Sequence, residues 1–189
     1  PALEKAEADA RAAETAARAE KEEAHRDHAA LAIRQGLKPG ARRLAVGQVF
    51  LPRNDLDAQE RCRCITEAEI LRMGYSIFGW RQVPINTAVC GEKANATRPE
   101  IEQIMVANVR GSDDDQFERD LYIVRRRIEK QVAAENITDF YICSLSCRSV
   151  IYKGMFLAEQ LAEFYPDLKD ERFVSAFAIY HQRYSTNTF

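Results

Sequence analysis

The sequence lacks long apolar runs and any excess of charge of one sign. No apolar run approaches the roughly 18 residues needed to span a bilayer, and the first residues lack the apolar stretch of a signal peptide. Its 27 lysine and arginine residues nearly balance 29 acidic ones, which leaves a net charge of −2. Without a basic surface, nucleic-acid binding is not predicted. We therefore expect a cytoplasmic protein with neither a membrane nor a nucleic acid as its partner.

Cysteine is present but not in a pattern typical of disulfides or metal sites. The five cysteines are an odd number, so we expect reduced thiols. Cys62 and Cys64 are separated by one residue and Cys143 and Cys147 by three, so neither pair has the C-x-x-C spacing. No histidine lies near either pair, and we predict no metal site. Cys90 is expected to be a small core residue.

The first 36 residues differ in composition from the rest. They are rich in alanine, glutamate, arginine and lysine, and Thr15 is the only β-branched residue before Ile33. Pairs of an acid followed four residues later by arginine favour a helix, and Gly36 is a plausible stop. These pairs are Glu7–Arg11, Glu14–Arg18 and Glu22–Arg26. We expect a charged helical arm over residues 1–36, either an interaction helix or a solvated, partly disordered segment.

Residues 37–189 are expected to form one α+β domain. Apolar runs bounded by proline, glycine and polar turns predict strands. The predicted strands are 44–51, 75–83, 102–109, a hairpin of 140–145 with 149–152, and a terminal strand 173–180. The predicted helices are 57–73, capped by Asp57, then 115–135 and a short one over 155–164. Short turns between strands favour antiparallel sheets covered by helices.

The terminal predicted strand leads into a cluster suited to binding a carboxylate. Arg183 supplies a planar fork that can hold a carboxylate bidentately, and Ser185, Thr186 and Asn187 can complete the hydrogen bonding. In isolation, an arginine at a strand end also fits a structural ion pair.

Six motifs occur in an order that identifies a family. They are GQVFLP (47–52), FGWRQVP (78–84), FER (117–119), SLSCR (144–148), VIYKG (150–154) and HxRYSTNT (181–188). Together they closely resemble the class II glutamine amidotransferase domain of the glutamate synthase large subunit. The resemblance covers roughly residues 37–189 or starts as early as Ala24, and the Ala/Glu-rich stretch before about Ala24 does not resemble that domain.

The resemblance implies a fold, an activity and partners. The fold would be the four-layer αββα sandwich of the N-terminal nucleophile hydrolases. Such domains hydrolyse L-glutamine through an N-terminal cysteine and deliver ammonia to 2-oxoglutarate amination. Arg183 matches the arginine that binds the glutamine α-carboxylate, and Tyr184, Ser185, Thr186 and Asn187 match the pocket beside it. FMN and an iron–sulfur cluster are implied for a separate synthase domain, with the rest of the large subunit and a reductase subunit as partners.

The sequence also departs from the family pattern. It begins with Pro1 instead of the nucleophilic cysteine, and the Asn-Gly pair of the oxyanion hole does not occur before Phe189. We therefore expect an incomplete domain that is inactive in isolation. The alternative is a non-catalytic remnant of the fold that acts in binding or assembly through its helical arm. The sequence does not distinguish NADPH, NADH and ferredoxin as electron donor.

Overall fold

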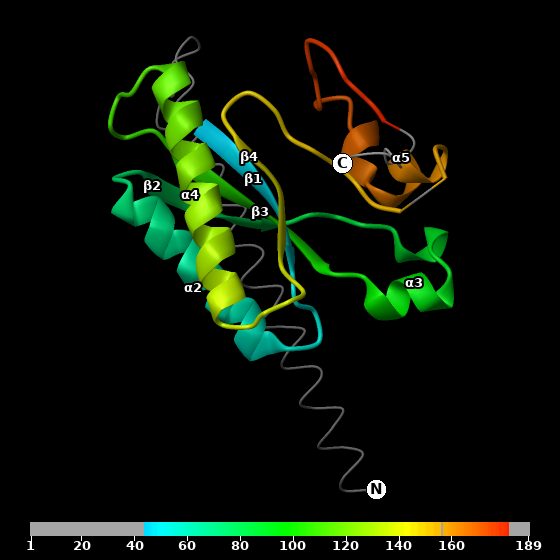
Figure 1. The fold of residues 1–189 in the computed structure, drawn as a ribbon. Coiled ribbons are helices and arrows are strands. Elements are labelled where there is room, and N and C mark those ends of the chain that lie inside the picture. The colour runs from blue at the N-terminus through cyan, green and yellow to red at the C-terminus, as the bar shows by residue number, and fades with distance from the viewer. Residues whose placement is uncertain (1–43, 156, 182–189) are drawn as a thin grey trace, which may run out of the picture.

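The computed structural model describes residues 44–155 and 157–181, which form an α+β fold on one antiparallel sheet (Figure 1). The strands lie in the order β2-β3-β1-β4, so the first described strand is in the interior of the sheet. They are β1 (Leu44–Leu51), β2 (Ser76–Gln82), β3 (Glu100–Ala107) and β4 (Tyr141–Ser146). These strands confirm the α+β class and the antiparallel sheet that the sequence predicts.

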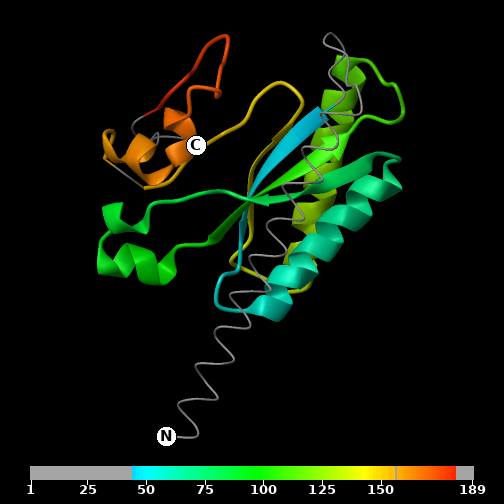
Figure 2. The same cartoon turned by 180° about the vertical axis from the view of Figure 1, so that it is seen from behind.

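Two long helices, α2 (Leu56–Arg72) and α4 (Asp114–Ala134), cover one face of the sheet (Figures 1 and 2). Each begins at an aspartate whose carboxylate accepts a backbone N–H of the first turn. Asp55 accepts from Ala58 at 2.9 Å, and Asp113 accepts from Gln116 at 2.8 Å. The prediction of Asp57 as the cap is wrong because Asp55 takes that position, which leaves Asp57 as an acidic residue of the first helical turn.

The main core lies between this helical layer and the sheet. Phe117, Leu121, Val124 and Ile128 are spaced three or four residues apart on α4, and all four are fully buried. They pack with apolar side chains of α2 and of all four strands. The predicted apolar face of this helix is thereby confirmed.

Shorter elements lie on the other side of the sheet. They are η1 (Thr87–Val89), α3 (Glu92–Thr97), α5 (Gln160–Phe164) and η2 (Pro166–Lys169). Phe164 and Tyr165 are buried against Val83 and Ile101, which forms a second, smaller core. We call residues 147–181 the C-terminal segment. Its α5 lies away from α2 and α4 in both views (Figures 1 and 2).

The predicted strand at 149–152 is wrong because serine side chains bind its backbone. The Ser146 hydroxyl accepts the N–H groups of Arg148 and Ser149 at 3.0 and 3.2 Å. The Ser144 hydroxyl accepts the N–H of Ile151 at 3.1 Å. These bonds offer the backbone an alternative to a strand ladder, so β4 is not followed by a returning hairpin strand.

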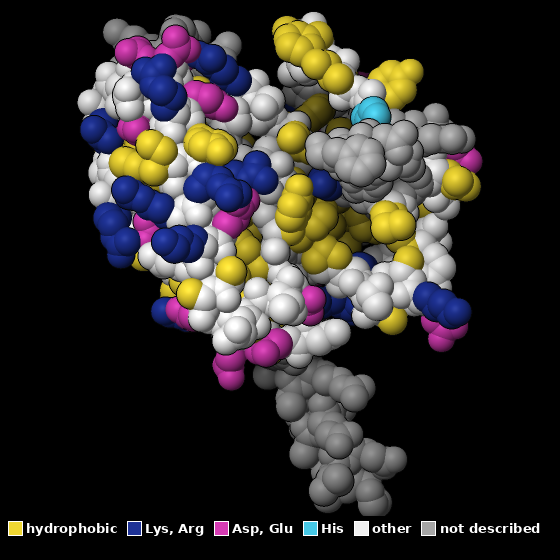
Figure 3. All heavy atoms as spheres, viewed as in Figure 1, with side chains coloured by type: hydrophobic (Ala, Val, Ile, Leu, Met, Phe, Trp, Pro, Cys, Tyr) yellow, Lys and Arg dark blue, Asp and Glu magenta, His cyan; other side chains and the backbone are white. Residues whose placement is uncertain are grey.

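The predicted strand at 173–180 is also wrong. The apolar pattern is present, but these residues are exposed, and no described strand pairs with them. Val174 and Ile179 are each 87% exposed, and other apolar side chains of the C-terminal segment also face solvent (Figure 3). A strand requires a hydrogen-bonding neighbour, and the sheet described ends at β2 and β4. The short helix predicted over 155–164 is reduced to α5, and the arm over residues 1–36 lies outside the described residues.

Candidate functional site

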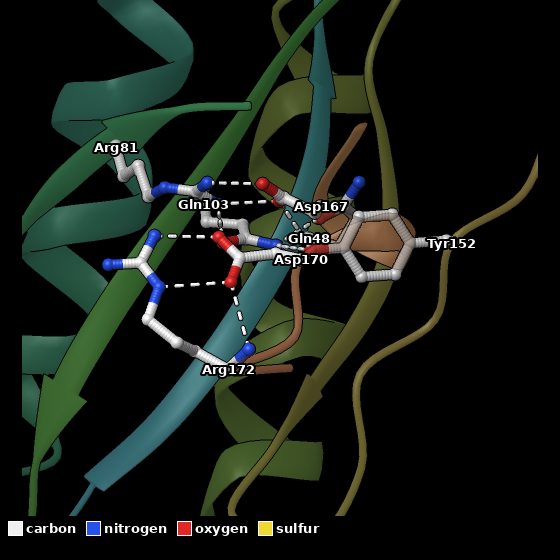
Figure 4. Close-up of polar contacts among 7 residues, drawn as sticks. All are labelled: Gln48, Arg81, Gln103, Tyr152, Asp167, Asp170 and Arg172. Carbon is white, nitrogen blue, oxygen red and sulfur yellow. Dashed lines mark hydrogen bonds and ion pairs between the residues drawn. The ribbon is translucent and has the colours of Figure 1, made fainter. Parts of the chain in front are cut away.

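The residues predicted to bind substrate follow the part of the chain that the structure describes. Arg183, Tyr184, Ser185, Thr186 and Asn187 lie outside the described residues, which end at His181. The C-terminal segment, which precedes them in the chain, meets the sheet at a group of polar side chains, of which Gln48 and Gln103 are buried. We call this group the sheet-face cluster, and it consists of Gln48, Arg81, Gln103, Tyr152 and Asp167 (Figure 4).

Strand pairing places three of these side chains in one row across the sheet. Gln103 on β3 pairs with Gln48 on β1 and with Arg81 on β2. Residues paired directly across antiparallel strands project from the same face. Their neighbour Glu102 contacts Arg63 of α2, with 2.9 Å between Arg63 Nε and Glu102 Oε2, so the row lies on the face away from α2 and α4.

Arg81 joins this row to the C-terminal segment. Its guanidinium donates to both carboxylate oxygens of Asp167, with Nη2 at 2.6 Å from Oδ1 and Nη1 at 2.8 Å from Oδ2. The same Nη1 donates to Gln103 Oε1 at 2.9 Å. The Asp167 side chain is only 11% exposed. A two-point contact of this kind fixes direction as well as distance.

Tyr152 and Gln103 close the cluster into a ring of hydrogen bonds. Tyr152 OH donates to Asp167 Oδ2 at 2.8 Å and accepts from Gln103 Nε2 at 3.0 Å. Gln103 Nε2 also donates to Gln48 Oε1 at 2.8 Å. Gln48 is fully buried, and its own Nε2 has no hydrogen-bond partner among the described residues. A buried unpaired donor marks a place where a further acceptor would fit.

The electrostatics of the cluster suit positioning rather than proton transfer. Burial raises the pKa of Tyr152 to about 12, and the hydrogen bond to Asp167 acts in the same direction. Burial of Asp167 opposes its ionisation, but hydrogen bonds from Arg81 and Tyr152 outweigh burial and lower the carboxyl pKa. Near neutral pH the phenol therefore stays protonated and the carboxylate charged, so neither is poised as a general acid or base.

The cluster continues toward His181 through close contacts. The Tyr152 ring packs edge-on against Phe173, with centroids 5.8 Å apart, and against Tyr165, with centroids 5.0 Å apart. Asp170 accepts two hydrogen bonds from the Arg172 guanidinium, at 2.9 and 2.6 Å (Figure 4). These contacts give residues 170–173 a defined path.

The five cysteines do not form a reactive centre in the structure. Burial is the main cause that raises the pKa of Cys62 and Cys147 to about 11 and that of Cys143 to about 12. Thiolate is the nucleophilic form, so these three thiols are poor nucleophiles near neutral pH. Cys90 is half-buried beside the smaller core, in the packing role that the sequence predicts. Within residues 44–155 and 157–181, no three histidine, cysteine or acidic residues are grouped to hold a metal ion.

A separate hollow of about 430 Å³ lies at the end of β1. Its lining includes Arg53, Arg98, Asp139 and Tyr141. Arg53 Nη1 donates to the carbonyl of Asn95 at 2.7 Å, so part of this guanidinium holds the wall itself. Charges of both signs face the hollow, and it does not define a ligand class.

The strand predicted over 75–83 includes Arg81, but no pattern in the sequence identifies Asp167 as its partner. The two residues are 86 positions apart in the chain. The sequence does carry one local indication of the cluster. Charged and amide side chains occur within three otherwise apolar strands, and a polar group that is buried there requires a hydrogen-bond partner.

Among the described residues, no helix is long and apolar enough to cross a membrane.

Comparison with known proteins places these features in a family. Residues 27–189 match the model of the class-II glutamine amidotransferases. The chain is 76% identical over 147 residues to the glutamate synthase [NADPH] large chain of Azospirillum brasilense, covering 78% of this chain and 10% of that protein. It is 44% identical over 156 residues to the chloroplastic ferredoxin-dependent glutamate synthase of Spinacia oleracea, a match that covers 82% of this chain and 10% of that protein. The glutamate synthase [NADPH] large chain of Bacillus subtilis is 40% identical over 152 residues, a match that covers 80% of this chain and 10% of that protein. The chain thus spans about a tenth of the length of these curated relatives.

Proposed function

Because this chain belongs to the class-II glutamine amidotransferases, we propose that it is part of the glutaminase domain of a glutamate synthase large subunit. The 76% identity to the Azospirillum brasilense large chain carries this proposal. In the proposed role, the domain hydrolyses L-glutamine to glutamate and delivers the ammonia to 2-oxoglutarate amination elsewhere in the polypeptide.

The proposed complete fold is the four-layer αββα sandwich. The sheet has α2 and α4 on one face and mainly short elements on the other, as expected for one half of such a sandwich. A second sheet would lie against the face that carries the sheet-face cluster. The exposed apolar side chains of residues 173–180 and the unpaired Gln48 Nε2 are consistent with further chain covering this side.

The proposed glutamine site uses the stretch that follows His181. Arg183 would hold the α-carboxylate of glutamine through two parallel hydrogen bonds. Tyr184, Ser185, Thr186 and Asn187 would line the pocket beside that carboxylate. These roles rest on the HxRYSTNT motif and on the chemistry of the side chains.

The nucleophile of the proposed reaction is not one of the five cysteines of this sequence. Class II chemistry uses a cysteine whose own α-amino group acts as the base, and an internal cysteine has no such amine. Cys62, Cys143 and Cys147 also have raised pKa values. The chain by itself is therefore expected to be inactive toward glutamine.

The proposed cofactors belong to another part of the enzyme. FMN and an iron–sulfur cluster would serve the synthase reaction, whereas the described residues of this chain offer no group of ligands for a metal centre. The expected partners are L-glutamine, the remainder of the large subunit and a reductase subunit, with a cytoplasmic location. We propose that residues 1–36 form a charged arm and residues 37–189 the amidotransferase domain, although residues 27–36 of this arm lie within the stretch that matches the family.

The proposal is tested by replacing Arg183 in a complete glutamate synthase that carries these residues. Arg183→Lys keeps the charge but loses the planar fork, so glutamine-dependent synthesis should fall by about 100-fold or more while ammonia-dependent synthesis is retained. The matched control is Arg126→Lys, because the Arg126 side chain is 64% exposed and pairs with neighbouring Glu129 on α4. Equal loss of both activities in Arg183→Lys would make this arginine structural and would count against the proposed site.

A further inference from the structure

Residues 157–170, which contain α5 and η2 and which we call the strap, pack on the sheet through a core of their own. Phe164 and Tyr165 of the strap are buried against Val83 and Ile101 in the smaller core. The main core, between the sheet and the helices α2 and α4, shares none of its residues with this smaller one. The strap can therefore leave the sheet without unpacking the two long helices.

The backbone of the strap has little attachment to the rest of the fold. The backbone N–H of Asn86 donates to the carbonyl of Phe164 at 2.8 Å. Among the described residues, this is the one backbone hydrogen bond that joins the strap to residues 44–155. By contrast, β1 pairs along its length with β3 and with β4. Segments with few such bonds and a small core open at a lower free energy than the main core does.

Side-chain contacts of Asp167 supply the strongest polar attachment of the strap. Its carboxylate accepts two hydrogen bonds from the Arg81 guanidinium, at 2.6 and 2.8 Å, and one from Tyr152 OH at 2.8 Å. Gln103 on β3 accepts from the same guanidinium at 2.9 Å, which holds Arg81 in place on the sheet (Figure 4). Hydrogen bonds between ionised groups are roughly twice as strong as neutral ones, so this pair contributes more than the single backbone bond.

We propose that the strap opens from the sheet as a unit and that the pair of Arg81 and Asp167 is the latch that holds it closed. Opening uncovers Val83 and Ile101 on the face of the sheet away from α2 and α4, while the main core stays packed. The latch thus controls access to this face. The inference does not depend on the proposed function, because it rests only on contacts between described residues.

The test is amide hydrogen exchange, resolved to single residues, in a complete glutamate synthase that carries this sequence. The Asn86 amide reports detachment, because its acceptor is Phe164 of the strap. The Val83 amide is the matched reporter of the sheet, since it donates to the carbonyl of Ile101 at 3.0 Å. In Arg81→Met we expect exchange at Asn86 to become about 10-fold faster or more, with Val83 within about twofold of wild type.

Two further variants accompany Arg81→Met. Asp167→Asn keeps the shape of the side chain but loses its charge and one acceptor oxygen, so exchange at Asn86 should rise by a smaller factor. Arg61→Met is the matched control. Arg61 also forms a bidentate pair, with its Nε and Nη2 at 2.7 and 2.5 Å from the two oxygens of Glu135, but this pair joins α2 to the end of α4. Its loss should leave exchange at Asn86 unchanged.

The comparison of the two amides decides the outcome. Faster exchange at Asn86 alone supports opening of the strap as a unit. Equal acceleration at Asn86 and Val83 would mean that the sheet itself loosens, and it would overturn the inference. Exchange at Asn86 that changes no more in Arg81→Met and Asp167→Asn than in Arg61→Met would also overturn it. If Arg81→Met does not fold, the same comparison in Asp167→Asn decides.

Discussion

Replacing Gly47 by alanine tests the close packing in the middle of β1. A Cβ atom at this position would lie 2.7 Å from Cγ2 of Ile104 and 2.9 Å from Cδ1 of Leu145. Carbon atoms in good contact are about 3.5–4.0 Å apart, so both side chains must move. Ile104 is fully buried and Leu145 is 7% exposed, which leaves them little room.

The expected cost follows from two opposing effects. Overpacking a core costs about 1–3 kcal/mol, whereas the lower entropy of alanine in the unfolded chain offsets about 0.4–1 kcal/mol. We therefore expect Gly47→Ala to lower the free energy of unfolding by about 1–2 kcal/mol.

Urea denaturation followed by tryptophan fluorescence measures this change. Trp80 is the only tryptophan and is 7% exposed, so it reports directly on the sheet. Gly91→Ala is the matched control, because a Cβ there meets no atom within 4 Å, and we expect a change of at most about 0.5 kcal/mol. If Gly47→Ala is as stable as wild type, or if Gly91→Ala loses as much, the packing argument is wrong.

Two further predictions concern titration and thiol reactivity. The pKa of Asp167 is lowered from 3.8 in the folded chain, so its carboxylate stabilises the fold above that value and this contribution is lost as pH falls through the folded pKa. Asp167→Asn should therefore show a smaller loss of thermal midpoint than wild type between about pH 5 and pH 2, and an equal loss would contradict this linkage. Cys64 is exposed whereas Cys62 and Cys143 are buried with raised pKa values, so a thiol reagent near neutral pH should modify Cys64 faster than Cys62 or Cys143. Mass mapping of the modified peptides checks this order, and early modification of Cys143 would contradict it.

Local sequence patterns predict the elements of the helical face and its strands well. The run 44–51 is a strand with the predicted bounds, and the apolar spacing that predicts a helix over 115–135 gives α4 at Asp114–Ala134. Both elements turn an apolar face toward the core, so the spacing of apolar residues in the sequence matches the spacing of buried residues in the structure. Trp80 is buried on β2, as expected for tryptophan.

Patterns fail where the outcome depends on a partner outside the segment. The apolar run at 173–180 has strand-forming residues, but a strand exists only where another strand pairs with it. The segment after Ser146 fails for the opposite reason, because nearby serine hydroxyls take up its backbone N–H groups. Neither a missing neighbour nor a competing side chain is visible in the periodicity of apolar residues.

The sheet-face cluster is also not visible in the local pattern of apolar residues. Its parts come from three strands, the stretch after β4 and η2, and only the register of β1, β2 and β3 brings Gln48, Arg81 and Gln103 into one row. Resemblance to a family supplies the proposed roles of residues 183–187, while geometry supplies the contacts of Arg81. The two sources thus bear on different parts of the chain.

The most direct test of the central claim is an experimental structure of a complete glutamate synthase carrying these residues, with glutamine trapped in its glutaminase domain. The account predicts that both guanidinium nitrogens of Arg183 lie about 2.7–2.9 Å from the α-carboxylate oxygens of glutamine. An Arg183 paired instead with a protein carboxylate, with the glutamine α-carboxylate held by other residues, would contradict it.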